Sequence, residues 1–230
     1  MWKKRVLTLL LFSALLFVMA CDDGDLPFPP KQDKARVMVV HASPDAPGVD
    51  VLLDDELFAK NLEYPNNTRY TSLEEGAHNV KVNVTDTDNT VIEADLDLMA
   101  DTYYSIFACN VVDNIEPLVL VDDFSDPGVE NSLVRFVHLS PDAPAVDVTL
   151  TDGTVLFGNV TFKGATEYKL LDVGVYDLQV RLAGTEDVVL ELDDVVLGPA
   201  VIYTIWAKGL VDGEGDQALG AEIIWNKIKF

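Results

Sequence analysis

The chain contains the same phrase twice, as His41-Ala-Ser-Pro-Asp-Ala-Pro-Gly-Val-Asp-Val51 and as His138-Leu-Ser-Pro-Asp-Ala-Pro-Ala-Val-Asp-Val148. The two copies share nine of eleven residues and begin 97 positions apart. Solenoid repeats are much shorter, at about 20–50 residues per unit. The spacing therefore predicts a duplication that gives two domains of ordinary size.

The similarity continues beyond the phrase, since Gly76–Val82 matches Gly174–Val180 and Tyr104–Ala108 matches Tyr203–Ala207. Each copy consists of short β-rich runs separated by turn residues every eight to twelve positions. Such a pattern predicts an all-β chain with two tandem antiparallel β-sandwiches of immunoglobulin-like form. In the first copy the predicted strands are Arg36–His41, Val49–Leu53, Leu57–Leu62, Arg69–Leu73, His78–Thr85, Thr90–Leu98, Thr102–Asn110 and Pro117–Val121.

The N-terminus has the features of a secretory signal. A basic head, Trp2–Arg5, precedes the uncharged aliphatic run Val6–Ala20, which is short for a membrane span. Val18 and Ala20 lie three positions and one position before Cys21, so this segment resembles the lipobox of bacterial lipoproteins. The resemblance implies cleavage before Cys21 and lipidation of that residue, and two or more acyl chains anchor a protein stably. The alternative is a soluble secreted protein in which Cys21 is incidental.

These observations predict how the chain is divided. The Pro-rich segment after Cys21 is typical of an extended tether, and the polar, turn-rich stretch after the first copy is typical of a linker. The predicted parts are a signal peptide (1–20), a lipidated cysteine and tether (21–34), a first sandwich (35–122), a linker (123–131) and a second sandwich (132–230).

The chain is strongly acidic. Removal of residues 1–20 would remove three of its 16 basic residues and none of its 39 acidic residues, leaving a formal net charge of −26. A polyanion of this strength is repelled by nucleic acid, so no nucleic-acid partner is expected. Hydrophobic residues make up 49% of the sequence, which argues against a disordered acidic tail.

One thiol remains once Cys21 is lipidated, so no disulfide is expected within the chain. Cys109 occupies a predicted strand, and the matching position in the second copy is Lys208. A residue that lysine replaces in the other copy is not a nucleophile common to both.

The repeated phrase is predicted to form a rigid corner between two strands. Ser43, Pro44 and Asp45 fit the first three positions of a type I turn. Prolines also keep the residues before them out of the helical region. The motif residues are His41, Ser43, Pro44, Asp45, Pro47 and Asp50 in the first copy and His138, Ser140, Pro141, Asp142, Pro144 and Asp147 in the second.

The residues of this corner allow two functional alternatives. A hydrolytic trio of His41, Ser43 and Asp45 is disfavoured, because Cβ atoms two residues apart in an extended segment lie roughly 6–7 Å apart. The chain also lacks a G-x-S-x-G elbow, so no catalytic residue is predicted.

The second alternative is a calcium ion, because hard cations prefer oxygen ligands. Aspartate in a turn more often caps backbone groups, and His78 aligns with Tyr176, so no multi-histidine site recurs. No cofactor is therefore expected apart from this alternative. The candidate calcium ligands are Asp45, Asp50, Asp142 and Asp147.

The repeated phrase, the later Gly-x-(His/Tyr)-x-(Val/Leu)-x-Val strand and the ending Glu116–Asp123 resemble the bacterial domain of unknown function family 4397. The resemblance implies β-sandwich domains in secreted or lipid-anchored envelope proteins, and it implies no reaction. The sequence thus predicts a non-enzymatic, lipid-anchored protein of the bacterial cell envelope, facing the periplasm or the cell surface. Its role would be structural, adhesive or the binding of an envelope protein or glycan. A calcium-dependent module is the alternative, and a hydrolase is less favoured.

Overall fold

The computed structural model describes residues 34–227. The predicted signal peptide, the lipidation of Cys21 and the tether up to residue 33 lie outside these residues. Among residues 34–227, no helix is long and apolar enough to cross a membrane.

The first copy folds into two four-stranded sheets, ordered β4-β1-β7-β8 and β3-β2-β5-β6. Alternating valines and isoleucines such as Val37, Val51, Val82 and Ile106 fill the space between the sheets, because successive side chains of a strand point to opposite faces. The strands are β1 (Lys34–Ala42), β2 (Val49–Leu53), β3 (Glu56–Leu62), β4 (Thr71–Glu74), β5 (Gly76–Val84), β6 (Thr90–Leu98), β7 (Tyr103–Cys109) and β8 (Glu116–Asp122).

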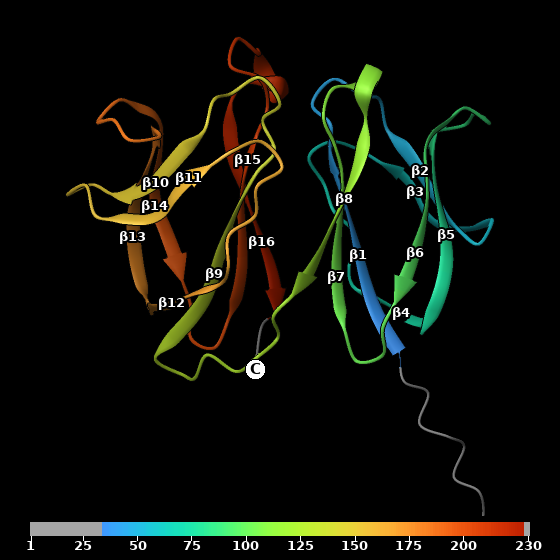
Figure 1. Cartoon of the computed structure of the whole chain (residues 1–230), viewed down its shortest axis with the longest axis horizontal. Coiled ribbons are helices and arrows are strands. Elements are labelled where there is room, and N and C mark those ends of the chain that lie inside the picture. The colour runs from blue at the N-terminus through green and yellow to red at the C-terminus, as the bar shows by residue number, and fades with distance from the viewer. Residues whose placement is uncertain (1–33, 228–230) are drawn as a thin grey trace, which may run out of the picture. The chain divides into compact units, whose positions relative to one another are not determined.

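The second copy repeats this topology, with sheets ordered β12-β9-β15-β16 and β11-β10-β13-β14 (Figure 1). Its core contains Phe136, Val148, Val180 and Ile205 at the matching positions. The strands are β9 (Asn131–His138), β10 (Val146–Leu150), β11 (Val155–Val160), β12 (Lys169–Asp172), β13 (Gly174–Leu182), β14 (Val188–Leu197), β15 (Ile202–Lys208) and β16 (Gly220–Lys227).

The predicted fold class, two tandem β-sandwiches, is confirmed. One feature was not predicted: β1 pairs with β7, and β9 with β15, in parallel. Neither pair is joined by a hairpin, so the chain is free to bring these strands together in the same direction. The remaining pairings between named strands in residues 34–227 are antiparallel.

A third hydrophobic core joins the two sandwiches. The faces of β1 and β7 that point away from the first core contribute Val40 and Phe107, and the equivalent faces in the second copy contribute Val137 and Trp206. All four side chains are fully buried. Burial on both faces explains why β1 is a continuous apolar run from Val37 to Val40 rather than an alternating one.

A ring of buried and half-buried polar side chains lies at the same junction. Asp122 accepts hydrogen bonds from Arg135 and from the Tyr70 hydroxyl. Arg135 Nε donates to Thr204 Oγ1 at 2.9 Å, and Thr204 donates to Asn226 Oδ1 at 2.8 Å. Asn226 Nδ2 closes the ring by donating to Tyr70 at 2.8 Å. Residues of the two sandwiches thus serve as each other's hydrogen-bond partners, as buried polar groups require.

Candidate functional site

The histidine of the repeated phrase fastens the corner. His41 and His138 are fully buried, and each Nε2 lies 3.0 Å from a proline carbonyl oxygen, that of Pro47 or Pro144. A carbonyl only accepts, so Nε2 carries the proton and donates. Burial lowers the pKa of both histidines. The rings are therefore neutral and structural.

The first aspartate of the phrase caps a loop distant in sequence. Asp45 Oδ1 accepts the backbone N–H of Val112 at 2.8 Å, and Asp142 Oδ1 accepts that of Val211 at 3.1 Å. Val112 and Val211 occupy matching places in the loops that precede β8 and β16. The aspartate thus ties the corner to that loop in each copy.

The second aspartate of the phrase accepts hydrogen bonds from backbone N–H groups of neighbouring segments. Asp50 accepts the N–H of Asn61 at 2.8 Å, and Asp147 accepts that of Asn159 at 2.6 Å. Both asparagines have positive φ, 47° and 52°, which asparagine tolerates better than most residues. The other carboxylate oxygen of Asp147 accepts the N–H of Gly184 at 2.8 Å. Backbone groups therefore occupy these carboxylates.

The structure does not assemble the hydrolytic trio. Ser43 and Ser140 are fully buried, which leaves no access for a substrate. The Nε2 of each neighbouring histidine bonds to a proline carbonyl. Pro44–Asp45 and Pro141–Asp142 form the turn at the corner itself.

The four candidate calcium ligands do not converge on a common point with other ligands. In residues 34–227 no three histidine, cysteine, aspartate or glutamate side chains are grouped to hold a metal ion. The calcium alternative stays a prediction, with no geometric support in the described part of the chain.

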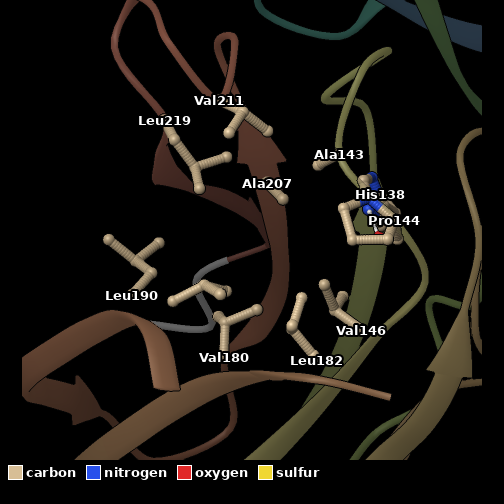
Figure 2. Close-up of a pocket in the computed structure, with 11 residues that line it drawn as sticks. His138, Ala143, Pro144, Val146, Val180, Leu182, Leu190, Ala207, Val211 and Leu219 are labelled. Carbon is tan, nitrogen blue, oxygen red and sulfur yellow. Dashed lines mark hydrogen bonds between the residues drawn. The ribbon is translucent and has the colours of Figure 1, made fainter. Parts of the chain in front are cut away.

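A cavity of about 450 Å³ opens beside the corner of the second sandwich (Figure 2). Its walls come from both sheets and from the loop between β15 and β16. In Figure 2, Val180 and Leu182 on β13 face the same space as Val211 and Leu219 on the loop. The lining residues are His138, Ala143, Pro144, Val146, Val180, Leu182, Val189, Leu190, Ala207, Val211 and Leu219.

The loop before β16 distinguishes this end of the second sandwich from that of the first. It spans residues 209–219, whereas the matching loop of the first copy spans 110–115. Ile115, the residue that precedes β8, packs against the first core. Its counterpart Leu219 lines the cavity instead. In the first sandwich, Val82, Ile92 and Ala108, the counterparts of three lining residues, border a space of only about 10 Å³, whose other lining residues have no counterpart in the cavity.

Two glycines let the longer loop fold on itself. Gly209 has φ +81°, and a Cβ at Gly209 or at Gly213 would collide with the backbone of Gln217 or Ala218. Leu210 N–H donates to the Gln217 carbonyl at 2.8 Å. The loop is therefore a folded wall of the cavity.

The chemistry of the cavity is apolar. Its one ring with polar atoms is His138, whose Nε2 already donates to Pro144 and whose Nδ1 is buried without a partner. Within residues 34–227, no lysine, arginine, aspartate or glutamate lines it. An apolar concavity of this size falls within the range of about 300–1,000 Å³ that is usual for ligand sites.

This cavity was not predicted from the sequence. A signal was nevertheless present, because the chain is five residues longer between Lys208 and Gly220 than between Cys109 and Glu116. The longer segment contains both glycines that shape the loop, Gly209 and Gly213. Comparison of loop lengths between the copies would have directed attention to this end of the second sandwich.

The fold and site define an all-β protein of two joined sandwiches with an apolar cavity in one of them. A profile of the domain of unknown function family DUF4397 matches residues 35–149. The chain belongs to this family. No curated protein matches the chain. A solved structure of the CBM26-family module CBMbc from Eubacterium rectale, in complex with maltoheptaose, is 8% identical, with a TM-score of 0.28. That comparison covers 84% of this chain and 98% of the other.

Proposed function

We propose that this protein is a non-enzymatic binding protein of the bacterial cell envelope, attached to a membrane through Cys21, with its ligand site in the cavity of the second sandwich. The observation that carries the proposal is the contrast between the copies. At this end of the first sandwich Ile115 packs against the core, whereas its counterpart Leu219 in the second sandwich lines a cavity of about 450 Å³.

A binding role fits the way the cavity is built. The residues at its base lie on strands of both sheets. One wall is a loop whose Val211 N–H is hydrogen-bonded to Asp142 of the corner. A rigid, preformed site binds with little loss of conformational entropy. The buried serines and engaged histidines of the repeated phrase offer no reactive group at its surface.

The cavity favours an apolar group over a sugar. The hydroxyl groups of a glycan need hydrogen-bond partners when they leave water, and unpaired polar groups cost free energy. The lining of valine, leucine, alanine and proline supplies almost none. A glycan or protein partner on another surface remains a prediction of the sequence.

Binding is tested with a neutral fluorescent probe, 1-N-phenylnaphthylamine, whose emission rises in apolar surroundings. Val211 is 48% exposed at the cavity wall, so Val211→Trp should obstruct the cavity without disturbing the core. Val112→Trp at the matching position of the first sandwich is the control. We expect saturable probe binding to the wild type and the control and its loss in Val211→Trp. Equal binding by all three proteins would refute the proposed site.

The anchor is tested separately in the native bacterium. Cells fed radiolabelled palmitate should label the wild-type protein and not the Cys21→Ser variant. An unlabelled wild-type protein would contradict the anchoring part of the proposal and leave the cavity result unaffected.

A further inference from the structure

We infer that the cavity of the second sandwich holds the hydrocarbon part of an amphiphile whose head group is neutral or positively charged, and that it rejects anionic amphiphiles. This inference rests on the proposed function and specifies the ligand class for the same site. It follows from the size of the cavity, its lining and the charges around it.

The size and lining favour a hydrocarbon group. An engineered apolar cavity of about 150 Å³ stays dry and binds benzene, so about 450 Å³ offers roughly three times that room. Atoms lining an apolar space lose dispersion contacts when it is empty and regain them when a hydrocarbon enters. Figure 2 shows these aliphatic side chains pointing into one continuous space.

The charges around the cavity disfavour an anion. Asp142 is next to the lining residue Ala143, and Asp212 is next to the lining residue Val211. Glu214 and Asp216 are exposed in the same loop, and Asp187 is exposed at the hairpin tip before β14. The loop that forms one wall of the cavity therefore carries three carboxylates and no basic residue.

Nearby basic residues do not offset this charge. Arg181 lies between the lining residues Val180 and Leu182, so strand alternation directs it to the opposite face. There its guanidinium donates to Gln179 Oε1. Lys208 follows Ala207 in the same way and pairs with Glu222 at 2.8 Å. An anionic head group would find no positive partner and would be repelled.

The experiment displaces bound 1-N-phenylnaphthylamine with three amphiphiles of equal chain length, decyltrimethylammonium, decanol and decanoate, each below its micelle concentration. At low salt we expect decyltrimethylammonium and decanol to displace the probe, and decanoate to bind roughly ten-fold or more weakly than decyltrimethylammonium. High salt should narrow this difference, since exposed charges are screened. Among primary alcohols of increasing chain length, affinity should rise about four-fold per methylene until the cavity is full.

Variants locate the charge effect. The double variant Asp212→Asn with Glu214→Gln should reduce the difference in affinity between decyltrimethylammonium and decanoate. Asp113→Asn in the matching loop of the first sandwich should leave this difference unchanged. Circular dichroism verifies that each variant is folded.

The outcomes separate the two proposals. If the probe binds, Val211→Trp abolishes binding and decanoate competes as well as decyltrimethylammonium, the inferred ligand class is wrong and the binding site stands. If neither the probe nor any amphiphile binds the wild type, both the inference and the proposed site are overturned.

Discussion

Asn226 in β16 donates a hydrogen bond to the hydroxyl of Tyr70, 156 residues earlier in the chain, at 2.8 Å. This bond joins the second sandwich to the first, and the ring of Asp122, Arg135 and Thr204 continues from it. Equivalent positions carry different chemistry: Asn226 corresponds to Asp122, and Arg135 corresponds to Met38. The buried charge pair is therefore formed by one residue from each copy.

Removal of Arg135 alone should be strongly destabilising. Arg135→Met installs the residue of the first copy and leaves Asp122 buried without its cation. We expect the free energy of unfolding to fall by about 3–5 kcal/mol, because an uncompensated buried charge is costly. Urea denaturation measures the change. The double variant Arg135→Met with Asp122→Asn, which installs the sister residue at both sites, should recover most of the loss. A loss below about 1 kcal/mol in the single variant would contradict this account.

Removal of Asp147 should weaken the second sandwich without involving a metal. Asp147→Ala leaves the N–H groups of Asn159 and Gly184 without their acceptor, and we expect a loss of about 1 kcal/mol. Asp50→Ala in the first copy is the matched variant. Thermal unfolding in calcium and in chelator is compared for all three proteins. We expect no difference between the two conditions, whereas a calcium-dependent rise confined to the wild type would establish a cation site.

Stability should fall as the pH decreases below about 6.5. Burial lowers the pKa of His41 and His138, so below the unfolded pKa the unfolded chain binds protons that the folded chain does not. The free energy of unfolding then falls by at most about 1.4 kcal/mol per pH unit for each histidine. Well above that pH both histidines are neutral in the folded and the unfolded chain, so their titration no longer changes the free energy of unfolding.

His78 opposes this effect and has to be removed in the same measurement. Burial lowers its pKa, but hydrogen bonds to Asp54 and to the Glu74 carbonyl outweigh burial and raise it overall. In a His78→Ala background, chemical denaturation between about pH 7.5 and 5.5 isolates the buried histidines. Replacing both His41 and His138 by Gln should reduce the slope of the free energy of unfolding against pH. An unchanged slope would show that these two histidines do not cause the pH dependence.

The Cys109 thiol should be inert in the folded protein. It is fully buried in the core between the sandwiches, and burial raises its pKa to about 12. In a Cys21→Ser variant, which retains this one thiol, dithiobisnitrobenzoate should react only after denaturation. Rapid reaction under native conditions would mean that the core between the sandwiches opens readily.

The strand pattern of the first copy was predictable because its strands alternate or carry β-branched runs. The predicted ranges Val49–Leu53 and Thr90–Leu98 coincide with β2 and β6. Local periodicity does not encode partners, so the parallel pairing of β1 with β7 could not be predicted. The apolar face that meets the other copy could have been suspected from Val37–Val40, since adjacent apolar residues in a strand point to both sides.

The site was less predictable than the fold. The candidate site residues predicted from the sequence belong to the repeated phrase, which forms a structural corner in each copy. The cavity depends on what the two copies do not share, namely the residues between Lys208 and Gly220 and the displacement of Leu219 from the place that Ile115 occupies. Residues that the two copies share build the common fold, and the cavity lies where the copies differ in loop length.

The core between the sandwiches has a consequence for how such a site can arise. Val40 meets the second copy through the same face that Val137 presents to the first, as in a symmetric homodimer. In a homodimer every substitution appears in both subunits. Covalent fusion of the two halves lifts that restriction. One half can then keep a closed core while the other diverges, so a feature present in a single copy, such as the cavity beside His138, can arise within one chain.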